Sequence, residues 1–119
     1  MVQENPPNKW ADIVLPLKIH LHDKTTIEAY THKVRPTRIF AVSRENINIA
    51  ADSPVGIEII LFKGDRPIYA TGRVKKVASD EYPPGNPYSS IEIKLSSMAT
   101  SRHMELWRER LAWYYQMGS

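Results

Sequence analysis

The chain has 119 residues and a mass of 13.7 kDa, the size of one domain with one modest core. Its 42% hydrophobic and 24% charged residues are ordinary for a folded protein, and its longest apolar run is broken by Glu58, so no membrane span is predicted. The absence of cysteine excludes disulfides, cysteine-ligated zinc and thiol catalysis, while the formal charge of +3 permits an anionic partner without requiring one. The N-terminus lacks the features of a secretory signal, so we expect a cytoplasmic protein.

The first half of the chain is predicted to form an arm and then short strands. Residues 1–10 are polar and proline-rich and are expected to be a flexible arm before a single domain over 11–117. Apolar and polar residues alternate from Ile13 to Leu21, which predicts a strand with one buried face. Pro16 cannot donate to a ladder, so this strand is expected to be an edge or to bend there. Further strands are predicted over 26–34, 37–43, 47–50 and 55–62.

The second half continues the strand pattern and then changes to a helix. Residues 63–66 predict a four-residue hairpin turn before a strand over 67–79. Residues 80–88 contain three prolines and predict a long surface loop, after which 90–95 alternate again. Six or seven closely spaced strands without intervening helices indicate a small antiparallel barrel or sandwich.

Residues 101–117 predict one amphipathic helix, because they lack glycine and proline and place apolar residues at helical spacing. Met104, Trp107, Leu111 and Tyr114 form the main stripe, and Trp113 falls off it. Two interpretations remain open: the helix covers the mouth of the barrel, or its surplus aromatic residues contact another protein or a second copy of the chain. The candidate contact residues are Trp107, Leu111, Trp113 and Tyr114.

The ordered set of short motifs resembles the PilZ domain, a bacterial family that binds the second messenger cyclic di-GMP. The matching segments are Ser43–Ile49, Ser53–Gly56, Gly72–Val74 and Ile91–Leu95, the last of them before a helix. The resemblance extends over about residues 12–115. It implies a mainly β fold, a six-stranded antiparallel β-barrel with a C-terminal α-helix.

The resemblance also locates a candidate ligand site, and the sequence departs from the family there. The family's arginine pair before the first strand is absent, and its Asp/Asn-x-Ser-x-x-Gly motif is incomplete: Ala41 stands at the first position, Ser43 matches, and Asn46 replaces the glycine. Asparagine is the residue that best tolerates a left-handed backbone after glycine, so the turn can persist. Arg35, Arg38 and Arg44 could supply a substitute anion site if they share one face. The candidate ligand-binding residues are Arg35, Arg38, Ser43, Arg44 and Asn46.

Other chemistries have weaker signals. His20 and His22 share one strand face at the spacing of a metal pair, and His32 or Asp23 could supply a third ligand, but the sequence has no cysteine and no second ordered cluster of histidine and carboxylate residues. No nucleophile elbow or P-loop surrounds any serine or glycine, so we expect neither an enzyme nor a bound cofactor. A nucleic-acid-binding barrel would alternate aromatic and basic residues on its strands, whereas here the aromatic residues gather on the helix.

The sequence therefore predicts a non-catalytic PilZ-like receptor or adaptor in bacterial cyclic di-GMP signalling, in motility, pili or surface attachment. It is expected to act through contact with a protein partner or a second copy, with weak or no direct nucleotide binding. One alternative is a direct cyclic di-GMP receptor that uses a non-standard arginine site. The other is a small nucleic-acid-binding barrel.

Overall fold

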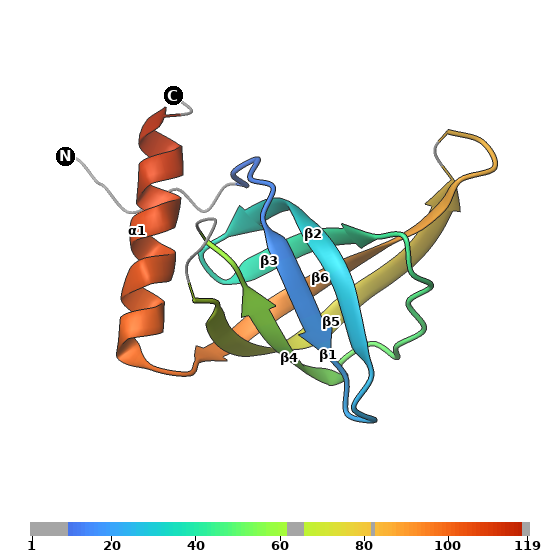
Figure 1. Cartoon of the computed structure of the whole chain (residues 1–119), viewed down its shortest axis with the longest axis horizontal. Helices are drawn as coiled ribbons and strands as arrows, with labels where there is room; N and C mark the ends of the chain where they lie inside the picture. Colours follow the sequence, from blue (N-terminus) through green and yellow to red (C-terminus); the bar gives the residue numbers. More distant parts are fainter. Residues whose placement is uncertain (1–9, 62–65, 82, 118–119) are drawn as a thin grey trace.

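The computed structural model describes residues 10–61, 66–81 and 83–117, and shows a closed six-stranded barrel with one helix (Figure 1). The elements are β1 (Pro16–His20), β2 (Thr26–Arg35), β3 (Arg38–Ser43), β4 (Pro54–Ile59), β5 (Ile68–Glu81), β6 (Pro87–Met98) and α1 (Ser101–Met117). The strands follow the order β1-β2-β3-β6-β5-β4 around the barrel, and every neighbouring pair is antiparallel.

The core fills the inside of the barrel, because alternate residues of each strand point inward. On β3, for example, Ile39, Ala41 and Ser43 are buried, while Phe40 and Val42 between them are only partly covered. Branched aliphatic side chains dominate the interior; those almost fully buried are Ile13, Ile19, Ile39, Ile57, Ile59, Ile68, Ile91, Ile93, Val34 and Val74.

Helix α1 lies at one end of the barrel, as Figure 1 shows. Trp107 and Leu111 are buried against the core, and the indole Nε1 of Trp107 donates a hydrogen bond to the Pro36 carbonyl in the β2–β3 turn (3.0 Å). Thr100 caps the helix, since its hydroxyl accepts a hydrogen bond from the His103 backbone N–H (3.0 Å). The predicted covering helix is confirmed, with the predicted bounds. No helix in the described ranges is long and apolar enough to cross a membrane.

The opposite end of the barrel is closed by the segment after β3, where the sequence predicted a strand over 47–50. That prediction is wrong: the backbone N–H of Ile47 donates to the Ser89 hydroxyl (3.2 Å) instead of to a neighbouring strand. The Ile47 side chain is nevertheless buried. The apolar pattern of this segment therefore reflects burial in the core and not the pairing of a strand.

The N-terminal strand also differs from its prediction. It begins at Pro16 and pairs with both β2 and β4, so it is not an edge strand; the missing N–H of Pro16 falls at the start of the strand. Ile13 and Leu15 precede it and are held by Thr31, whose buried hydroxyl donates to the Ile13 carbonyl and accepts from the Leu15 N–H (2.7 Å).

Strands β5 and β6 are longer than predicted and project from the barrel as a hairpin, at the end opposite the helix in Figure 1. The predicted loop over 80–88 is shorter in the structure, because Asp80 pairs with Tyr88 and Glu81 with Pro87. Proline at the first position of β6 is compatible with a strand. The predicted arm over 1–10 lies outside the described residues except for Trp10, and so does the predicted turn over 63–66 except for Arg66.

Candidate functional site

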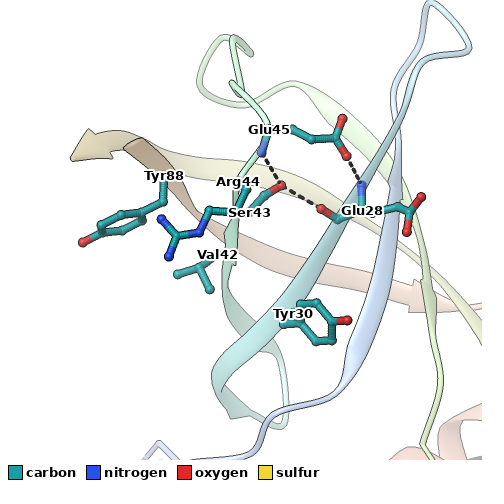
Figure 2. A pocket seen from close by; sticks show the side chains of 7 residues that line it. All are labelled: Glu28, Tyr30, Val42, Ser43, Arg44, Glu45 and Tyr88. Carbon is teal, nitrogen blue, oxygen red and sulfur yellow. Dashed lines mark hydrogen bonds between the residues drawn. The ribbon is translucent and has the colours of Figure 1, made fainter. Parts of the chain in front are cut away.

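Two of the five candidate ligand-binding residues, Ser43 and Arg44, lie at the hairpin end of the barrel, where a pocket of about 540 Å³ opens beside the end of β3 (Figure 2). Strand β2 supplies two of its residues, β3 and the turn after it supply four, and β6 supplies one. The lining residues are Glu28, Tyr30, Val42, Ser43, Arg44, Glu45 and Tyr88.

Ser43 holds the backbone together beneath this pocket. Its hydroxyl donates to the Glu28 carbonyl (2.7 Å) and accepts from the Glu45 N–H (3.0 Å), while the Glu45 carboxylate accepts from the Glu28 N–H (2.8 Å). Figure 2 shows these three bonds as dashed lines. The β2–β3 ladder begins only at Tyr30, so the side chains of Ser43 and Glu45 replace the strand partner that Glu28 lacks there.

Arg44 is the only cation among the described residues that line the pocket. Its guanidinium donates to the Asn86 and Pro87 carbonyls at the tip of the hairpin (3.3 Å each) and lies beside the Tyr88 ring in Figure 2. The carboxylates of Glu28 and Glu45 border the same pocket. The lining therefore carries two negative charges against one positive charge, a balance that opposes the binding of a phosphate group.

The structure does not bring the three candidate arginines together. Arg35 and Arg38 are cross-strand partners at the helix end of the barrel, whereas Arg44 follows the other end of β3. Arg44 follows Arg38 by six residue steps of extended chain, which corresponds to about 20 Å. The substitute anion site built from all three is therefore wrong as a single site.

Both upstream arginines are already engaged at the helix end. The Arg35 guanidinium lies over the Trp10 ring, 4.4 Å from its centroid. Arg38 pairs with the Glu92 carboxylate on β6.

The two altered positions of the motif can be placed as well. Ala41 is fully buried in the barrel, where an unpaired carboxylate would be costly. Asn46 does not adopt a positive φ; among the described residues other than glycine, only Lys24 and Asp52 do. The expected left-handed turn at Asn46 is therefore wrong, and the roles of Ser43, Arg44 and Asn46 in ligand binding stay predictions.

The four candidate partner residues separate into two groups. Trp107 and Leu111 are buried in the chain's own core, so neither is exposed to contact a partner, contrary to the expectation. Tyr114 is half-buried. Trp113 is 48% exposed, packs edge-on against Tyr114 with 5.0 Å between ring centroids, and lines a second pocket with Leu106, Glu109 and Arg110.

Sequence reasoning missed Tyr30, Glu28 and Tyr88 as pocket residues, because only the packing of β2 and β6 on either side of β3 places them near Ser43. The metal hypothesis gains no support: His20 Nε2 contacts the Glu58 carboxylate (2.9 Å), and its Nδ1 lies 3.0 Å from the Thr26 hydroxyl. No three histidine, aspartate or glutamate side chains are grouped as a metal site in the part of the chain that the structure describes.

Comparisons with known proteins support the fold. No protein-family model matches the chain, and no curated protein matches it in sequence. Among solved structures, the chain is similar to the Bacillus subtilis inhibitor of motility MotI/DgrA, with a TM-score of 0.68 and 16% sequence identity. The match covers 92% of this chain and 50% of that one, so this chain spans about half the length of its structural neighbour. The fold is the PilZ-like barrel with a C-terminal helix that the sequence pattern predicted.

Proposed function

We propose that the protein is a non-catalytic PilZ-like adaptor in bacterial cyclic di-GMP signalling that controls motility, and that it acts by protein contact with weak or no direct nucleotide binding. The similarity to a motility inhibitor over almost the whole chain supports the motility assignment. The adaptor role is supported by the charge of the pocket at the end of β3, which disfavours the binding of a nucleotide.

The charge of that pocket is the observation that carries the proposal. Cyclic di-GMP has two phosphodiester groups and two guanines, which are ordinarily bound by several guanidinium groups. Here one arginine faces two glutamates, and that arginine already donates to two backbone carbonyls. The Ser43 hydroxyl is likewise used within the fold. A nucleotide would have to displace these bonds and overcome the repulsion of the glutamates.

Calorimetric titration with cyclic di-GMP tests this proposal directly. We expect no binding stronger than a Kd of about 0.1 mM, equivalent to about 5.5 kcal/mol. The same titration should be repeated with Arg44→Ala and with Arg108→Ala, which removes an exposed arginine from the helix, away from the pocket.

Micromolar binding that Arg44→Ala abolishes and Arg108→Ala preserves would overturn the adaptor proposal. It would establish the alternative, a direct receptor with a non-standard arginine site.

A further inference from the structure

A row of basic residues crosses the outside of the barrel, and neither the candidate site nor the fold accounts for it. The strand registers pair Arg35 with Arg38, Arg38 with Lys94, and Lys94 with Arg73, so these four side chains occupy one line over β2, β3, β6 and β5. Each lies next to a fully buried residue of its own strand, so each points outward; those inward neighbours are Val34, Ile39, Ile93 and Val74.

Three lysines extend this row into a patch. Lys33 precedes Arg35 on β2, and Lys75 and Lys76 follow Arg73 at the β5 bulge. We call these seven residues the cationic face: Lys33, Arg35, Arg38, Arg73, Lys75, Lys76 and Lys94. Two carboxylates, Glu92 and Asp52, pair with it. Seven cations against two carboxylates leave an excess of five, larger than the +3 of the whole chain, so the rest of the chain is acidic on balance.

Part of the face is held in place by aromatic rings. The Lys33 ammonium lies 5.1 Å from the Trp10 ring centroid and 5.3 Å from that of Phe40, and the Arg35 guanidinium covers Trp10 at 4.4 Å. Such stacking restricts the side chains before any partner binds and so lowers the entropic cost of binding. The buried Arg35 Nε has no hydrogen-bond partner among the residues that the structure describes.

We infer that the cationic face binds an acidic, extended polypeptide segment of a partner protein. This inference rests on the proposed adaptor function, because it names the class of partner for the protein contact. The face already accepts carboxylates, as the Arg38–Glu92 and Lys75–Asp52 pairs show. Its row crosses four of the six strands of a closed barrel, so it curves around the molecule, and an extended chain can follow that curve where a flat rigid surface cannot.

The limited exposure of the aromatic rings on the cationic face favours a polypeptide over single-stranded nucleic acid as the partner. Proteins that bind single strands stack bases on aromatic side chains that are open to the ligand. Trp10 and Phe40 are both only partly exposed, and cations of the chain itself cover them. The face thus presents charge without a stacking platform.

Fluorescence anisotropy with a labelled peptide of about ten glutamates tests the inference, with a labelled oligothymidylate of matched charge as the second probe. We expect the peptide to bind at about 0.05 M salt and to weaken steeply towards about 0.3 M, as screening requires. Lys94→Glu and Lys76→Glu, at exposed positions on the face, should each weaken binding by roughly tenfold. Lys24→Glu makes the same charge change in the exposed β1–β2 turn and should alter binding less than about twofold.

Three results would overturn the inference: no peptide binding at low salt, equal weakening by Lys24→Glu, or tighter binding of the oligothymidylate than of the peptide. The last would indicate a nucleic-acid surface. Failure of this inference can be distinguished from failure of the proposed function. Nucleotide binding is tested at Arg44 and peptide binding at Lys94, and these residues lie on different parts of the barrel.

Discussion

Ser43 shows how a residue can match a ligand-binding motif and still be required by the fold alone. Its hydroxyl forms hydrogen bonds with the backbone of Glu28 and of Glu45. Glu28 lies on the part of β2 that precedes the ladder with β3. A serine at this position is therefore explained without a ligand. The glutamate two residues later completes the same arrangement through the Glu28 N–H.

Replacement of Ser43 by alanine should accordingly lower stability whether or not a nucleotide binds. It leaves the Glu28 carbonyl and the Glu45 N–H without their partner, and we expect a loss of about 1–2 kcal/mol in the free energy of unfolding. Urea unfolding followed by circular dichroism measures this. Ser90→Ala, on the partly exposed outer side of β6, should change stability by less than about 0.5 kcal/mol. Equal effects of the two substitutions would contradict the structural role of the Ser43 hydroxyl.

At the scale of the element, β5 and β6 depend on a close backbone approach at Gly72. A Cβ added there would lie 2.6 Å from the Lys94 carbonyl oxygen and 2.8 Å from Ile93 Cγ2, beside an irregularity in the β5–β6 register. The sequence motif Gly72–Val74 therefore has a steric origin in this chain. Backbone and core must both move to admit even a methyl group.

Gly72→Ala should destabilise the protein by about 2–3 kcal/mol, the cost of overpacking a well-packed core. Gly56→Ala is the matched control on β4, since its added Cβ would meet only His20 Cβ at an ordinary 3.7 Å. We expect the control to change stability by less than about 0.5 kcal/mol. Thermal unfolding of both variants in parallel makes the comparison, and a Gly72→Ala variant as stable as Gly56→Ala would show that the strands separate easily at this point.

The elements also show what the sequence could and could not predict. Strict alternation identified the strands and helical spacing identified α1 with its bounds, because both are local signals. Strand pairing is not local. The pairing of Glu81 with Pro87 extends β5 and β6 into the predicted loop. The separation of Arg38 from Arg44 follows from the extended conformation of β3, although the two residues are close in sequence. Ile47 illustrates a third case, in which a buried apolar residue was assigned to a strand that does not form.

At the scale of the whole molecule, α1 acts as the cover of one barrel end. Trp107 is 2% exposed and also donates to Pro36, so it joins the helix to the β2–β3 turn across 71 positions of sequence. Trp113, six residues later, is 48% exposed. The two tryptophans therefore have different expected roles, one in folding and one at the surface.

Trp107→Ala should cost about 3–5 kcal/mol of stability, as for other large core truncations, whereas Trp113→Ala should cost less than about 1 kcal/mol. Chemical denaturation reports both values, and Trp107→Phe, which keeps an aromatic ring but loses the bond to Pro36, provides a variant more certain to fold. Light scattering on Trp113→Ala tests its part in self-association, because Trp113 is the exposed one of the four candidate contact residues. A Trp107→Ala protein of unchanged stability would mean that the helix does not cover the barrel.

In the projecting hairpin, β5 extends beyond the closed part of the barrel. Beyond Arg73, β5 has no ladder with β4, although Asp52 and Ser53 still bond Val74, so the next residues of β5 have no strand partner on their outer edge among the described residues. An open edge is a template for strand addition by another chain. Here the edge carries a bulge and four exposed charged residues, Lys75, Lys76, Asp80 and Glu81. These features guard against aggregation by sheet extension and disfavour a partner strand at this edge.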